Sequence, residues 1–214
     1  MHTYSNILPY FVNIFDDDEW QLECGKNSLV NSSERRYLDR DPQSHARIGQ
    51  KCDLVITSNK LCWFPELLIG EVSGGILPQC SAHKAWEDKI RLGIGLRDVL
   101  VRLENELPGI NQAVYGVQVV GYKLKVYAMV SREGLFHLML LYECYLPATL
   151  YEIYYIENIW NVLNTLHSKV RLLEMNILNL NRKKYNDRKR NLENQPIATV
   201  QPVVIGTPIT KKGR

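Results

Sequence analysis

The sequence lacks the features that mark exported and membrane-inserted proteins. Its first residues, MHTYSNILPYFVNIF, contain neither the basic segment nor the clean apolar segment of a secretory signal. No apolar run reaches the roughly 18 residues that a membrane-spanning helix requires. We therefore expect a protein without a membrane partner, located in the cytoplasm or the nucleus.

Motifs for covalent cross-links and for several common reactions are also missing. The five cysteines are an odd number, and none forms a CxxC pair or stands beside histidines at zinc-binding spacing. The sequence thus indicates neither a disulfide framework nor a zinc site. It also contains no GxxxxGK[ST], no GxGxxG after a strand and no GxSxG, which excludes the usual nucleotide-dependent transferases and serine hydrolases.

Charge is modest and unevenly distributed. The net charge is +3, but residues 182–214 alone carry +7, which leaves −4 for residues 1–181. A mildly acidic body argues against a domain that wraps nucleic acid, because cations that neutralise phosphates supply most non-specific affinity. The basic run over 182–190 has two interpretations, a segment for nuclear import or nucleic-acid contact and the solvated end of a helix.

The patterns that are present predict an α+β fold. Short apolar or alternating runs predict strands at 52–56, 66–72, 114–120, 122–130 and 135–146, and apolar positions recurring every three or four residues predict a helix over 84–107. A polar cap followed by charged residues predicts a short helix over 31–38. We expect a mixed central sheet between helices in one domain over 31–181, an N-terminal extension over 1–30 whose structure the pattern does not define, and a basic, flexible tail over 182–214.

A long helix is expected over about 149–185. Its apolar residues follow steps of four and three, a heptad pattern over three repeats, at Ile159, Leu163, Leu166, Val170, Leu173, Ile177 and Leu180. One interpretation is a helix that lies across the sheet and buries this seam. The other is a helix that binds a protein partner or a second copy of the chain.

Two acidic residues on the first two of these strands suggest a metal site. If strands 52–56 and 66–72 form an antiparallel hairpin centred on Cys62, Asp53 and Glu71 lie directly opposite each other. Opposed residues have Cβ atoms roughly 5 Å apart. Two carboxylates at that distance repel unless they are protonated or share a cation, and Mg²⁺ prefers oxygen ligands. The alternative is a pair of solvated carboxylates at strand ends.

The same segments resemble the core of the PD-(D/E)xK nuclease superfamily. The residues that carry the resemblance are GQKCD at 49–53, ELLIGEVSGG at 66–75 and the following helix, and it covers roughly 31–130. It implies a restriction-endonuclease-like fold and Mg²⁺-dependent hydrolysis of phosphodiester bonds in nucleic acid. It further implies that Asp53 and Glu71 bind the metal, with Glu34 on the preceding helix as a third ligand.

One position departs from the superfamily pattern. Ser73 stands where the motif lysine is expected, and a serine cannot offset developing negative charge. Lys84 or Lys89 on the next helix would have to supply that charge, whereas we assign Asp88 to an ion pair with Lys84. Two hypotheses follow: a Mg²⁺-dependent nuclease, or a catalytically inactive nuclease-fold module that binds partners through the long helix and the basic tail.

Overall fold

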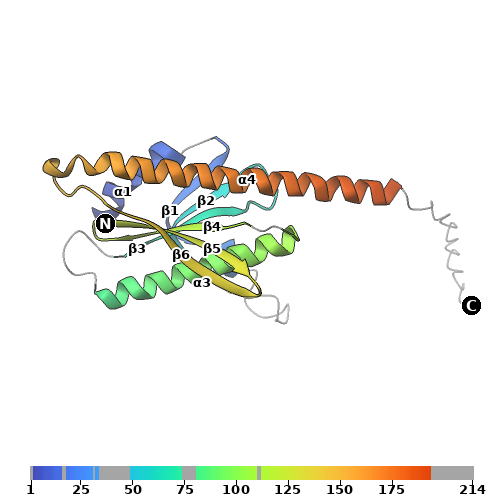
Figure 1. Cartoon of the computed structure of the whole chain (residues 1–214), viewed down its shortest axis with the longest axis horizontal. Helices are drawn as coiled ribbons and strands as arrows, with labels where there is room; N and C mark the ends of the chain where they lie inside the picture. The colour runs from blue at the N-terminus through green and yellow to red at the C-terminus, as the bar shows by residue number, and fades with distance from the viewer. Residues whose placement is uncertain are drawn as a thin grey trace, which may run out of the picture.

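Six strands form one sheet that lies between helices (Figure 1). The computed structural model describes residues 2–15, 18–30, 32–33, 49–73, 81–109 and 112–193. The strands are β1 (Trp20–Ser28), β2 (Lys51–Ser58), β3 (Glu66–Ser73), β4 (Val114–Val120), β5 (Lys123–Arg132) and β6 (Leu135–Tyr145). The helices are α1 (His2–Phe15), α3 (Ala82–Glu106), a 3₁₀ turn (Leu150–Glu152) and α4 (Tyr155–Glu193).

The strands follow the order of the chain across the sheet, from β1 to β6. Only the β3–β4 pair is parallel, and the other four pairs are antiparallel. A parallel pair needs a long crossover connection, which the segment containing α3 provides. The prediction of an α+β fold with a mixed sheet is confirmed, and β2 to β6 lie where the apolar patterns place them.

Helix α3 packs closely on the middle of the sheet. The Ser81 side chain caps its first turn by accepting a hydrogen bond from the backbone N–H of Lys84 at 3.1 Å. A Cβ atom at Gly95 would lie 2.7 Å from Cδ1 of Ile69 on β3, so the missing side chain permits the close approach of the helix. The N-terminal half of α3 lies beside the start of β2 and the end of β3, where the acidic pair is expected.

Helix α4 covers the opposite face of the sheet (Figure 1). Six of the seven residues of its heptad seam are at most 1% exposed, namely Ile159, Leu163, Leu166, Val170, Leu173 and Ile177, and Leu180 is partly buried against the same core. This confirms the interpretation of a long helix laid across the sheet. A partner helix cannot occupy this seam, because the chain's own core already fills it. Among the described residues, no helix is both long and apolar enough to cross a membrane.

Removing a side chain from the α4 seam should destabilise the protein strongly. Leu166 is 0% exposed, so Leu166→Ala is expected to lower the free energy of unfolding by about 3 kcal/mol through lost apolar contact and the remaining cavity. Leu172→Ala is the matched control, because Leu172 lies on the same helix and is 56% exposed. Urea unfolding of both variants measures the difference, and equal losses would show that α4 does not pack through this seam.

Polar contacts fix the position of α4 along the sheet. The Ser58 hydroxyl donates a 2.5 Å hydrogen bond to the buried carboxylate of Glu174, which also accepts one from Lys60 at 3.3 Å. The same Lys60, together with Arg171 of α4, forms ion pairs with Glu19. These contacts join α4 to the start of β1 and the end of β2.

Two predicted boundaries are wrong. Residues 1–30 are not an extension, because they include α1, whose Phe11 and Phe15 are buried in the core, and β1, which pairs with β2 along the edge of the sheet. The long helix continues to Glu193, so the basic run over 182–190 is helical and does not belong to a flexible tail. Residues 194–214 and most of the helix expected over 31–38, including Glu34, lie outside the described residues.

Candidate functional site

Asp53 and Glu71 meet at the end of the β2–β3 hairpin. The antiparallel ladder pairs Leu54 with Gly70 and Val55 with Ile69. Continued by one residue, this register sets Asp53 directly opposite Glu71, as the spacing about Cys62 predicts. Both side chains line a pocket of about 400 Å³, whose lining residues are Lys26, Lys51, Asp53, Glu71, Val72, Lys84, Asp88 and Arg91.

Three elements bring charged side chains to this pocket in addition to the acidic pair. Lys51 is two residues before Asp53, and alternate residues of a strand share one face. Lys26 comes from β1, where the pairing with β2 shifts between Cys24 and Asn27. Such an irregularity changes the direction in which the side chains of a strand point. Helix α3 contributes three side chains at steps of four and three, which place them on one helical face: Lys84, Asp88 and Arg91.

Glu71 is the buried acid of the site. The residue is only 5% exposed, and its Oε1 atom is buried without a hydrogen-bond partner. Burial raises the pKa of Glu71 to about 8, and the neighbouring charges of Asp53 and Asp88 act in the same direction. The Cys52 thiol and Arg91 oppose this shift and are weaker. The protein therefore holds a carboxyl group that keeps its proton at neutral pH unless a cation replaces it.

Asp53 is held in place by the backbone of the facing strand. Its Oδ2 accepts a 2.9 Å hydrogen bond from the backbone N–H of Val72. That bond lies just beyond the last paired residues of β2 and β3, Leu54 and Gly70, and holds the carboxylate beside the strand that carries Glu71. The arrangement needs a side chain with an acceptor oxygen at this distance from the backbone, which aspartate and asparagine both provide.

Asp88 is the functional candidate that reasoning from the sequence missed. It is 4% exposed and pairs with Arg91, with 3.5 Å between Oδ1 and Nη1, so the expected pair with Lys84 is replaced by one with the residue three positions later. Lys26 and Lys51 were missed as well. The sequence did contain a signal for Lys51, since it precedes Asp53 by two in a strand. It contained none for Lys26, because the bulge in β1 decides where that side chain points.

The two proposed catalytic lysines lie in different surroundings. Lys84 lines the pocket with Asp53 and Glu71. Lys89 lies instead over the ring of Tyr127, with its Nζ atom 5.5 Å from the ring centroid. Of the two, Lys84 is the one that the fold brings to the acidic pair, and the lining of the pocket does not include Lys89.

Ser73, at the position of the motif lysine, points into the protein. It is 0% exposed, and its hydroxyl accepts a 3.3 Å hydrogen bond from the side-chain amide of Gln118, the residue that pairs with Glu71 across β3 and β4. The same amide donates a 2.6 Å bond to the backbone carbonyl of Ala85 in α3. Ser73 thus helps to attach α3 to the sheet and supplies no charge to the pocket.

The donor set fits a hard divalent cation bound by two carboxylates. Within the described ranges, no group of three or more His, Cys, Asp or Glu side chains is arranged to hold a metal ion. Mg²⁺ commonly binds through one or two carboxylates and completes its shell with water and substrate phosphate oxygens. The unpartnered Oε1 of Glu71, opposite Asp53, has the oxygen and the position for such a ligand.

The surroundings of the pair combine both signs of charge. Three acidic side chains, of which Glu71 keeps its proton, stand among four cationic side chains within one pocket. Such a mixture suits a ligand that itself combines a cation with an anion.

Compared with known proteins, the chain matches no family model, no curated protein and no solved structure.

Proposed function

We propose that the chain is a divergent nuclease with a restriction-endonuclease-like core, which hydrolyses phosphodiester bonds of nucleic acid with Mg²⁺. The observation that carries the proposal is the buried, unpartnered Oε1 of Glu71 opposite Asp53. Leaving a buried acceptor without a partner costs about 1–3 kcal/mol. A cation between the two side chains would satisfy this oxygen and take the place of the proton on Glu71.

Asp53 and Glu71 would hold the metal ion. When bound, Mg²⁺ supplies a water of lowered pKa and neutralises charge on the phosphate. Asp53 is oriented for this role by the backbone of β3, through the hydrogen bond from Val72. Glu71 must release its proton before it can bind a cation, so metal affinity should increase as the pH rises toward about 8.

The cations of the pocket would hold the phosphate. Lys84 stands in the first turn of α3, where the helix dipole also favours an anion. Its ammonium group would offset the negative charge that develops during hydrolysis, the role that Ser73 cannot perform. Lys26 and Lys51 line the pocket on the strand side and would position the nucleic-acid backbone.

A catalytically inactive nuclease-fold module remains the second candidate. Two observations favour it: the motif position holds the buried, uncharged Ser73, and Glu71 is protonated at neutral pH without a cation. In this version the protein would bind partners through the exposed faces of α4 and the basic helical end over 182–190. The two candidates differ in whether the acidic pair takes part in a reaction.

The test is metal-dependent cleavage by the full-length protein and by a pair of lysine variants. Labelled single- and double-stranded DNA and RNA should be cleaved with Mg²⁺ or Mn²⁺ and left intact with EDTA. Lys84→Ala should reduce the rate about 10- to 100-fold, because it removes a charge that stabilises the transition state. Lys89→Ala is the matched control and should change the rate less than about twofold, since Lys89 lies over Tyr127.

The result also separates the two candidates. Absence of metal-dependent cleavage on all four substrates, in a protein that Mg²⁺ still stabilises against heat, would reject the nuclease and support the inactive module. Equal losses in Lys84→Ala and Lys89→Ala would reject the assignment of Lys84 to the pocket's chemistry.

A further inference from the structure

The first part of the β6 edge of the sheet carries no charged residue. β6 is the last strand in the sheet order, and no described strand pairs with its outer edge. Its first part, Leu135–Leu140, reads LFHLML and contains no Asp, Glu, Lys, Arg or Pro. The pairing with β5 is regular over these six residues, and the register shifts only after Leu140. An edge of this kind is a template for another strand, because its outer backbone groups have no strand partner.

The opposite edge of the same sheet has the features that prevent such pairing. β1 carries Glu23 and Lys26, and its pairing with β2 is interrupted by an irregularity around Gly25, whose φ angle is +120°. Charged residues and bulges are the usual protection of a free sheet edge. The contrast within one sheet indicates that the bare β6 edge is used for an interaction.

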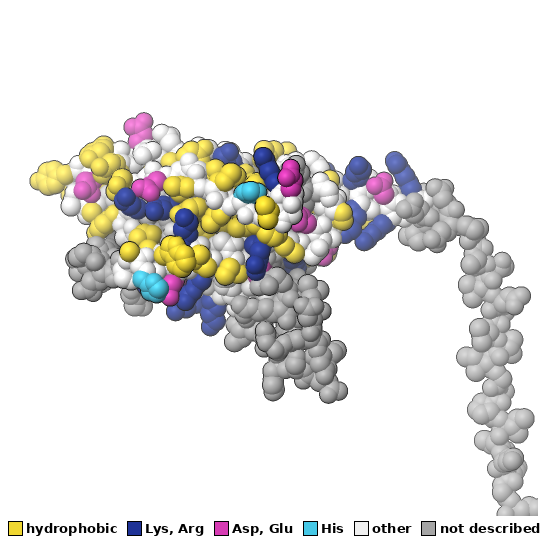
Figure 2. All heavy atoms as spheres, turned by 60° about the horizontal axis from the view of Figure 1, so that its bottom comes forward, with side chains coloured by type: hydrophobic (Ala, Val, Ile, Leu, Met, Phe, Trp, Pro, Cys, Tyr) yellow, Lys and Arg dark blue, Asp and Glu magenta, His cyan; other side chains and the backbone are white. Residues whose placement is uncertain are grey.

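Apolar side chains flank the β6 edge on both faces of the sheet. On β6 itself, Leu135 is 65% exposed, Phe136 39%, Met139 42% and Leu140 51%. Trp86 and Ile90 of α3 are 61% and 44% exposed. They share a helical face with Gly93, where a Cβ atom would lie 3.5 Å from Leu138 of β6. On the face seen in Figure 2, hydrophobic side chains gather across the middle of the molecule.

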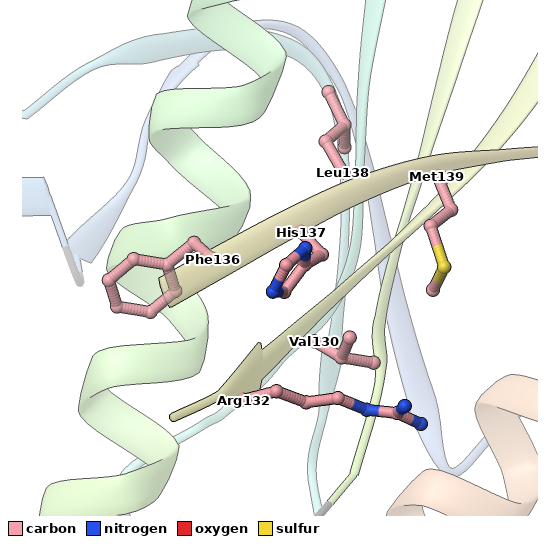
Figure 3. A pocket seen from close by; sticks show the side chains of 6 residues that line it. All are labelled: Val130, Arg132, Phe136, His137, Leu138 and Met139. Atoms are coloured by element: carbon pink, nitrogen blue, oxygen red, sulfur yellow. The ribbon is translucent and has the colours of Figure 1, made fainter. Parts of the chain in front are cut away.

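The surface beside this edge is also hollowed. A pocket of about 450 Å³ is lined by residues of β5 and β6. Figure 3 shows His137 and Met139 of β6 on the same side as Val130 and Arg132 of β5, whereas Leu138 points the other way. An apolar side chain from a partner strand would find space there.

We propose that this edge, defined by Leu135–Leu140 with Trp86 and Ile90, joins two copies of the chain by antiparallel pairing of β6 with β6. Two identical strands related by a two-fold axis run antiparallel, so the backbone N–H and C=O groups of each edge can pair with those of the other. No charge in Leu135–Leu140 opposes its own copy, which is the usual obstacle to self-pairing.

The apolar area is sufficient for a stable dimer. With about 200 Å² for a fully exposed large apolar side chain, the six side chains together expose on the order of 600 Å² per copy. A standard interface covers about 800 Å² per partner, of which about 55–65% is apolar. The dimer would place the two β6 strands at the centre of a twelve-stranded sheet, and none of the residues that line the pocket of Asp53 and Glu71 belongs to the interface.

Sedimentation equilibrium of the full-length protein tests this assembly. The wild type should have twice the monomer mass at micromolar concentration. Met139→Lys and Leu140→Lys should each weaken association at least about 100-fold, because each places two like charges in one apolar interface. Gln21→Lys, which introduces the same charge at an exposed position of the β1 edge, is the control and should leave the dimer intact.

Hydrogen exchange provides a second readout. Backbone amides of Leu135–Leu140 should exchange more slowly in the dimer than at dilutions where the wild type is monomeric, and circular dichroism should show that the lysine variants remain folded. A wild type that is monomeric at all concentrations overturns the proposal. So does a dimer that survives both β6 substitutions, because it must use a different surface.

Discussion

Glu71→Gln is expected to stabilise the metal-free protein by about 2–4 kcal/mol at pH 8.5, the opposite of the usual effect of a buried substitution. In the wild type the folded carboxyl has a pKa of about 8 against 4.5 for an unperturbed glutamate. Between these values the folded state keeps a proton that the unfolded state has lost. The free energy of unfolding therefore falls as the pH rises from about 4.5 to 8 and levels off above it.

Glutamine has the same shape and does not ionise, so the variant should lack this pH dependence. Urea unfolding at pH 5 and pH 8.5 measures the effect: the two proteins should be nearly equal at pH 5 and differ most at pH 8.5. Glu104→Gln, a change in a half-buried glutamate of α3, is the control and should leave the pH dependence unchanged. A wild type whose stability does not fall between pH 5 and pH 8.5 would show that Glu71 is not held as a buried acid.

Mg²⁺ should have the opposite effect on the two proteins' relative stability, because it should stabilise the wild type more than Glu71→Gln. Metal that binds only the folded state raises stability with the logarithm of its concentration. The wild type should gain stability from Mg²⁺ at pH 8.5 and much less at pH 6, where Glu71 holds a proton. Glu71→Gln should gain little at either pH. Equal stabilisation of both proteins would place the bound ion elsewhere.

Asp53→Asn should lower metal-dependent cleavage by about 1000-fold, equivalent to about 4 kcal/mol of transition-state stabilisation. The substitution removes the negative charge that a cation needs at this position. It keeps the side chain's size and an oxygen that can accept the hydrogen bond from Val72. The variant should therefore fold normally and lose activity through a lower rate constant at saturating Mg²⁺.

Single-turnover cleavage at several Mg²⁺ concentrations gives the comparison. Glu157→Gln, a charge-neutralising change in the exposed first turn of α4, should retain the wild-type rate. If Asp53→Asn cleaves as fast as the wild type, the activity does not come from this pocket, and the nuclease proposal fails. The same variant should still dimerise through β6, since Asp53 is not part of that edge.

The local patterns of the sequence were enough to locate most elements. β2 to β5 alternate or run apolar over strand-length segments, and α3 repeats its apolar residues at helical spacing, because each pattern reflects burial of one face of one element. The facing of Asp53 and Glu71 was predicted from the sequence on the assumption of a hairpin centred on Cys62. The register of β2 against β3 shifts by one residue between Ile56 and Thr57, so only the structure establishes the pairing that sets the two acids opposite each other.

Two other features do not follow from the apolar pattern of a single segment. β1 was not recognised because its apolar pattern is weak, and it is a strand through its pairing with β2. The end of α4 was set too early because the basic residues after 181 have no apolar period, although lysine and arginine favour helix. For β1 the deciding interaction is the pairing with another segment. For the end of α4 it is the helix propensity of the backbone, which leaves no apolar pattern in the sequence.

The sequence by itself determined the α+β class, the strands from β2 onward and α3, because these depend on the periodicity of single segments. The tertiary structure decided that α4 buries its seam against the sheet, that Lys84 and not Lys89 shares the pocket with the acids, and that Lys26 and Asp88 join them. Those outcomes depend on how α3 and α4 pack on the two faces of the sheet and on the irregularity in β1. That placement is a property of the packed core, which no single segment specifies.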